Sequence, residues 1–325
     1  MAAAWHRLWP VLALGTALLL AGCDEIGLKS SLSPQPRPAS LRVVPPTPVA
    51  PSAQSLDLAR YYHKVQNDLL TRGLLRTDGG GPDTPYSADD LARNFEKIVF
   101  YNEYSSGDGL SPAQRLQSGQ LSRWSGPVRI GTEFGASVPP DQRSRDQAQI
   151  DHYAGRLARI TGHAIAPVRN GANFHVLVVG EDDRDFLRRR LQQVIPGIGP
   201  AELDLFSNLP RSYYCLVIAV SGAHNPNDYT RAVALIRTEH PDLVRLSCVH
   251  EELAQGLGLS NDSPYARPSI FNDDDEFALL TSHDELLLKM LYDPRLKQGM
   301  TADQARPLTT AIARELMGQQ PQDPI

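Results

Sequence analysis

The feature that most constrains the fold is the spacing of apolar residues. After residue 124 this spacing switches between the two-residue repeat of a strand and the three-to-four-residue repeat of a helix. Apolar residues alternate over Val128–Phe134, as in a half-buried strand, and recur every three or four positions over 141–160, as in an amphipathic helix. Further segments follow in the order strand, helix, strand, strand and helix, at Phe174–Val179, Phe186–Val194, Tyr213–Val220, Ala232–Ile236 and Leu243–Leu257. We therefore predict an α+β domain over residues 124–320, with a twisted mixed sheet whose strands are mostly parallel.

Helical patterns flank these segments on both sides. Leu58, Val65 and Leu69 recur at helical spacing, and a second helix is expected to begin at Ser87, where Asp90 completes a capping box. We expect residues 55–123 to form a helical part packed on the main domain, and the chain to end in a short helical part.

The N-terminus is predicted to be a secretory signal over residues 1–22. The apolar run Leu8–Leu20 follows a short basic head and is shorter than the about 20 residues that a spanning helix needs. Leu20-Ala21-Gly22-Cys23 resembles the bacterial lipobox. The resemblance implies that Cys23 is lipidated and anchors the chain to a bilayer in the cell envelope, facing the periplasm. Asp24 after the lipidated cysteine favours the inner membrane.

Residues 23–54 are rich in proline, which breaks helices and removes sheet donors, so we predict an extended tether. Besides Cys23, the chain holds only Cys215 and Cys248. In an oxidising compartment this pair is expected to form a disulfide that links a helix to the sheet, and the alternative is two buried thiols. The net charge of −5 argues against a nucleic-acid partner, and the basic run Arg188–Arg190 is expected on a solvated helix face.

The segment from His250 to Asp262 carries the functional argument. A zinc helix that began at His250 would need a second ligand at position 254, which is an alanine. Shifted by one residue, the segment resembles the metzincin signature without a gap. In that alignment Glu251, Gln255 and Asn261 stand at the three ligand positions. Glu252 stands at the catalytic position and Gly258 at the turn.

Neighbouring residues extend the resemblance toward the matrixin branch. Leu257, Leu259 and Asp262 match its motif, and Pro268–Phe271 occupies the Met-turn region without the methionine. A helix beginning at Asp284-Glu285 and closing on Leu291-Tyr292 matches the final helix. The resemblance implies a zincin-like sheet, an active-site-type helix and a last strand that edges a cleft.

The chain also resembles a proteobacterial lipoprotein family, domain of unknown function 2927. The residues that carry this are Glu251-Glu252, Gln255, Gly258-Leu259 and Asn261-Asp262, together with Ser269–Asp273. That family has no established activity, so the resemblance implies kinship and no particular chemistry.

The replaced ligands decide the expected chemistry. Catalytic zinc takes three strong ligands and a water, whereas two amide oxygens suit harder ions. We expect no cofactor and no high-affinity metal, although a divalent ion could bind weakly. The leading hypothesis is a non-catalytic protein that binds an unknown polypeptide or takes part in envelope assembly. The alternatives are a metallopeptidase centred on Glu251, Glu252 and Gln255, and a motif that serves only as a helix end and turn.

Two histidines and an acidic run are further candidate ligands. His250 is expected to be packed or hydrogen-bonded, and His283 to cap a helix or lie at the surface, although either could complete a non-standard metal site. Asp273–Glu276 is expected to be a solvated loop before a helix, with a calcium site as the alternative.

Overall fold

The computed structural model describes residues 50–101, 104–105, 111–112, 119–272 and 274–319. The predicted signal over residues 1–22, the lipidation site expected at Cys23 and most of the predicted tether lie outside these ranges. The described residues belong to one compact unit, Pro48–Ile325. None of the helices in these ranges combines the length and apolar character that a bilayer span requires.

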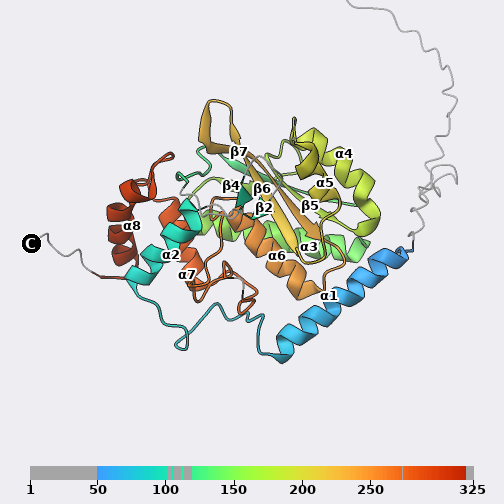
Figure 1. Cartoon of the computed structure of the whole chain (residues 1–325), viewed down its shortest axis with the longest axis horizontal. Helices are drawn as coiled ribbons and strands as arrows, with labels where there is room; N and C mark the ends of the chain where they lie inside the picture. The colour runs from blue at the N-terminus through green and yellow to red at the C-terminus, as the bar shows by residue number, and fades with distance from the viewer. Residues whose placement is uncertain (1–49, 102–103, 106–110, 113–118, 273, 320–325) are drawn as a thin grey trace, which may run out of the picture. The chain divides into compact units, whose positions relative to one another are not determined.

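A five-stranded sheet forms the centre of the fold (Figure 1). Its strands are β3 (Val128–Phe134), β4 (Ile165–Pro167), β5 (Phe174–Val179), β6 (Cys215–Gly222) and β7 (Asn225–Arg237). Their order across the sheet is β4-β3-β5-β7-β6, with β6 antiparallel to β7 and all other neighbours parallel. The predicted α+β class and mixed sheet are therefore confirmed. The last strand, β7, does not edge the sheet, because it turns back from β6 and pairs between β6 and β5.

Helices cover both faces of the sheet because alternate strand residues point to opposite sides. On one face, Phe174 and Val176 of β5 join a core shared with α3 (Pro140–Thr161) and α6 (Asp242–Gln255). On the other face, Leu177 and Val179 pack with α4 (Arg184–Val194) and α5 (Pro200–Ser207). The short helix η2 (Glu181–Asp183) connects β5 to α4.

The remaining helices extend the first layer. Helix α2 (Ala88–Phe100) packs against α7 (Ser282–Leu291) and α8 (Ala302–Leu316), away from α4 and α5 (Figure 1). Helix α1 (Ala53–Thr71) packs through Leu69 on Val244 at the start of α6. Two short strands, β1 (Tyr104–Ser105) and β2 (Ser111–Pro112), pair with each other.

Local signals explain where several helices begin. Ser87 and Asp90 form the predicted capping box of α2, and Thr281 and Asp284 form one for α7. Strand β4 and helix α5 were not predicted, and α8 was expected only as a short helical part at the end of the chain, without bounds. The last has its own capping box at Thr301, but Pro307 lies inside it and interrupts the helical signal.

The basic run lies on α4, where Arg188 and Arg189 are exposed. Arg190 forms an ion pair with Glu133 of β3, with 2.6 Å between Arg190 Nε and Glu133 Oε2. Two of the three residues are therefore solvated as expected, and the third contributes to packing of α4 on the sheet.

Candidate functional site

Helix α6 lies against β6 and β7 and carries the first part of the motif. Cys248 on α6 and Cys215 at the start of β6 form a disulfide with a Cα–Cα distance of 5.8 Å. This confirms the predicted link between helix and sheet. Glu251 and Glu252 follow three and four residues after Cys248, about one turn along the same helix.

Glu251 and Glu252 gather at the disulfide. A carboxylate oxygen of each lies within 4.8 Å of the other and of Cys215 Sγ. Glu252 is buried and Glu251 is half-buried. Because Cys215 is oxidised, it offers no thiolate here, and the two carboxylates are hard oxygen donors that favour ions such as Ca²⁺ or Mg²⁺.

The two amide residues of the motif have hydrogen-bond partners outside that acidic pair. Gln255 Nε2 lies 3.4 Å from Asp262 Oδ1. Asn261 is buried, and its Nδ2 donates to the main-chain oxygen of Lys97 in α2 at 3.2 Å and to that of Asp262 at 2.9 Å. Asn261 therefore anchors the turn after α6 to α2.

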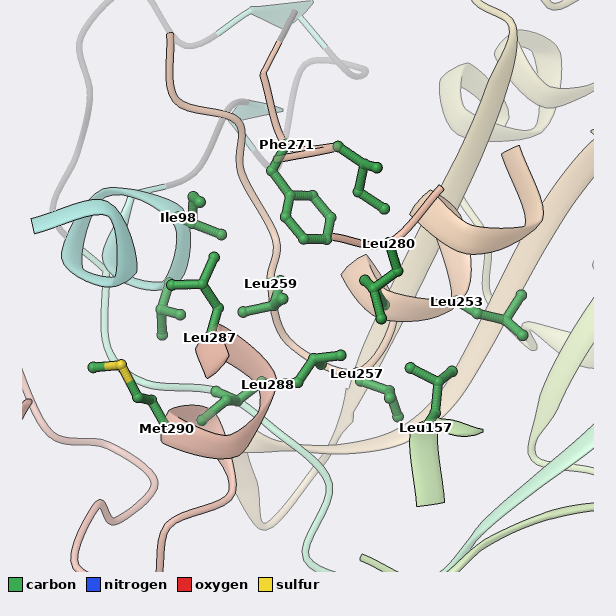
Figure 2. Packing of buried hydrophobic residues seen from close by; sticks show 14 of the residues in the cluster. Ile98, Leu157, Leu253, Leu257, Leu259, Phe271, Leu280, Leu287, Leu288 and Met290 are labelled. Atoms are coloured by element: carbon green, nitrogen blue, oxygen red, sulfur yellow. The ribbon is translucent and has the colours of Figure 1, made fainter. Parts of the chain in front are cut away.

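Gly258 occupies a backbone conformation that favours glycine. Its φ is +128°, and a Cβ atom there would meet the main-chain oxygen of Ser122 at 2.7 Å. Leu257 and Leu259 on either side are fully buried and pack with Leu287 and Leu288 of α7 (Figure 2). The turn residues of the motif are thus part of the core as well as neighbours of the candidate site.

His250 is packed and hydrogen-bonded, as expected. Its ring stacks on Tyr153 with 3.9 Å between centroids, and its Nδ1 accepts from the Leu280 amide at 3.0 Å. Burial, assisted by the positive charge of Arg156, lowers the pKa of His250 to about 3. The ring is therefore neutral at physiological pH, and its contacts are with buried residues of the fold.

The expectation that His283 caps a helix or lies at the surface is wrong. It lies in the first turn of α7 and is fully buried, with Nε2 3.2 Å from Asn94 Nδ2. The ring of Tyr86 meets it edge-on at 4.9 Å. Packing of α2 against α7 encloses this histidine. The residues next to His283 in the sequence do not indicate this contact, because Asn94 lies far from it along the chain.

Asp284 is a structural residue that sequence reasoning missed. It is fully buried and accepts from Ser269 Oγ at 2.5 Å, from the Ile270 amide at 3.1 Å and from the Thr281 amide at 3.0 Å. Its carboxylate therefore joins the 268–271 segment to the start of α7. The Thr281-x-x-Asp284 spacing is the signal that could have revealed it.

The acidic run lies in the loop before α7, but residues 277–281 separate it from that helix, so it does not lie at the helix N-terminus. Asp273 lies outside the described residues. Glu276 binds Arg76 at 3.1 Å and Arg267 at 2.6 Å, and Asp274 accepts from the Glu276 amide at 2.9 Å. Part of the run is thus neutralised by arginine.

A second buried polar group, also missed, follows the carboxyl end of β7. Glu239 Oε1 accepts from Ser55 Oγ of α1 at 2.9 Å and from the Glu181 amide at 2.7 Å. Burial raises the pKa of Glu239. Arg237 and His240 are buried on either side of it. The run of polar residues directly after the buried strand β7 is the sequence signal that could have revealed this group.

Comparison with known proteins places the chain in a family. No curated protein and no solved structure matches it. A family model described as "Protein of unknown function (DUF2927)" matches residues 88–311, which is more than half of the chain. The matched range includes the whole sheet, α6 with its motif, and α7. The chain therefore belongs to the DUF2927 family of proteins of unknown function.

Proposed function

We propose that this chain is a lipid-anchored protein of the bacterial cell envelope whose metzincin-like domain binds a polypeptide partner without catalytic zinc. The lipobox-like sequence ending in Cys23 and the proline-rich tether support the anchor. The gap-free alignment of Glu251–Asp262 with the metzincin signature supports the kinship of the domain.

The observation that carries the proposal is the hydrogen bonding at the third ligand position. Asn261, which stands where a metzincin has its third histidine, donates its amide to the main chain of Lys97 and Asp262. Gln255 at the second position contacts Asp262. A site with these donors lacks imidazole nitrogen, so zinc would bind weakly and its water would keep a high pKa.

The edge strand supports a polypeptide partner. β6 ends the sheet beside α6, and its residues from Val217 to Gly222 are half-exposed. An extended peptide can pair with such an edge through main-chain hydrogen bonds, while side-chain contacts supply specificity. Glu251 lies near the first residue of this strand and could contact a basic side chain of the partner.

Metal analysis tests the loss of the catalytic site. The mature protein, purified in detergent under non-reducing conditions, is expected to contain far less than one zinc per chain. Glu251→Ala should leave that content unchanged, as should Asp185→Ala on α4, across the sheet. Stoichiometric zinc that disappears only in Glu251→Ala would overturn the proposal in favour of a metallopeptidase.

Anchoring and partner binding need separate measurements. Cys23→Ser should abolish incorporation of a labelled fatty acid and release the protein from membranes. A photoreactive amino acid at Ser221 of β6 should form adducts with polypeptide in intact cells, whereas the same probe at Asp185 should not. Equal adduct formation at both positions would refute the β6 partner site.

A further inference from the structure

We propose that reduction of the Cys215–Cys248 disulfide creates a zinc site formed by both cysteines together with Glu251 and Glu252. The starting observation is the cluster at the β6–α6 junction. Cys215 Sγ and one carboxylate oxygen of each glutamate lie within 4.8 Å of one another, and Cys248 Sγ is bonded to Cys215 Sγ. Three potential ligand groups from two elements therefore lie close together, and the fourth, Cys248 Sγ, is bonded to one of them.

The oxidation state of the sulfurs decides which ions this cluster can hold. In the disulfide, neither sulfur is a thiolate, so only the carboxylates can donate strongly. Reduction by a dithiol transfers two electrons and two protons, which yields two cysteine thiols and the disulfide of the reductant. Zn²⁺ then displaces both thiol protons and gains two soft sulfur ligands.

The resulting ligand set suits zinc in number and charge. Two thiolates and two carboxylates complete a four-coordinate site, which is the usual geometry of structural zinc. The net charge of such a centre is the same as that of a four-cysteine zinc site, a set that proteins use widely. Sulfur donors select zinc over Mg²⁺ and Ca²⁺, so the reduced site differs in preference from the oxidised one.

The burial pattern gives the site an accessible side. Cys215 and Glu251 are half-buried, whereas Cys248 and Glu252 are buried. A reductant and an ion can therefore approach from Cys215, and the buried pair lies behind it. His240, whose Nδ1 lies 3.8 Å from Cys248 Sγ, borders the inner side.

The proposal goes beyond the binding function given above and does not depend on a partner or an anchor. Its physical consequence is that β6 and α6 stay joined in either state. The disulfide links them in the oxidised protein, and a zinc ion with ligands from both elements links them in the reduced protein.

Cobalt binding provides the primary test. The full chain in a Cys23→Ser background has thiols only at Cys215 and Cys248. It is reduced with dithiothreitol, freed of reductant without oxygen and titrated with Co²⁺. We expect one ion per chain with thiolate-to-cobalt charge-transfer absorption, displaced by Zn²⁺. The oxidised protein should show no such absorption.

Matched variants separate this site, which shares Glu251 with the metzincin ligand positions, from the second of those positions, Gln255. Glu251→Gln combined with Glu252→Gln should weaken Co²⁺ binding at least tenfold, whereas Gln255→Ala should leave it within twofold. Absence of the charge-transfer band in reduced, folded protein would overturn the proposal. So would a band whose affinity is insensitive to the two glutamate substitutions.

A second measurement covers the case in which the reduced apo-protein unfolds. The protein is reduced in the presence of Zn²⁺, and its zinc coordination is determined by X-ray absorption together with its thermal midpoint. Two sulfur and two oxygen neighbours, with a midpoint raised by zinc, are expected. Coordination without sulfur, or a midpoint that zinc does not raise, would refute the site.

Discussion

Removal of the Asp284 carboxylate should be among the most damaging single changes to this fold. Three donors converge on it, namely the Ser269 hydroxyl and the amides of Ile270 and Thr281. All of these contacts are buried, so a donor that loses its acceptor has no water to replace it.

The size of the effect follows from counting those donors. Each buried donor left unsatisfied costs about 1–3 kcal/mol, so Asp284→Ala should lower the free energy of unfolding by about 4 kcal/mol. Asp284→Asn keeps one oxygen, which can still accept from both amides. Only the contact with the Ser269 hydroxyl is disturbed, so this variant should cost about 1.5 kcal/mol.

Urea unfolding followed by far-ultraviolet circular dichroism measures both values. The exposed Lys289→Gln on the same helix is the control and should change stability by less than about 0.5 kcal/mol. Combining Asp284→Asn with Ser269→Ala should cost less than the sum of the single changes, because the two residues share a hydrogen bond. Equal costs for Asp284→Ala and Asp284→Asn would refute the reasoning.

Three further predictions concern stability. The double variant Cys215→Ala/Cys248→Ala should lose about 4 kcal/mol of unfolding free energy in urea, because the disulfide closes a loop with a sequence separation of 33; a loss under about 1 kcal/mol would contradict this. His250 has a pKa of about 3 in the folded protein and about 6.5 when unfolded, so stability should fall by about 3 kcal/mol from pH 7 to pH 4, since only the unfolded chain gains the proton. His250→Asn, which keeps an acceptor but does not titrate, should remove that slope in unfolding curves recorded at several pH values, and an unchanged slope would exclude His250 as its source. Gly258→Ala should cost at least about 2 kcal/mol in thermal unfolding, because its φ is +128° and the added Cβ meets backbone; wild-type stability would show that the turn relaxes freely.

Local sequence was sufficient wherever a local interaction decides the structure. The capping box at Ser87 begins α2, and alternation over Val128–Phe134 gives β3 with the predicted bounds. The disulfide was predicted from the cysteine count together with the expected oxidising compartment. The bounds of α8 were not predicted although Thr301 and Gln304 cap it, because Pro307 obscured its pattern.

The candidate site was less predictable because its contacts come from distant segments. The helical positions of Glu251 and Gln255 followed from spacing, but the partner of Asn261 is the main chain of α2, more than 160 positions earlier. His283 looked like a surface residue from its neighbours, and packing of α2 and α7 buried it. The spacing of apolar residues indicates whether a residue faces the core. It does not indicate which residues from distant segments contact each other in that core.

The sequence by itself determined most of the elements and the cysteine pair, because the spacing of apolar residues, helix capping and cysteine count act within a few residues or through composition. It predicted β7 only over Ala232–Ile236, whereas the strand spans Asn225–Arg237. Only the tertiary structure decided that β7 turns back from β6 and pairs between β6 and β5, that Asp284 accepts from three donors, and that two glutamates lie beside the disulfide. These outcomes depend on strand pairing and on the mutual packing of helices. Strand pairing and helix packing both depend on how much apolar surface is buried between segments that lie far apart along the chain.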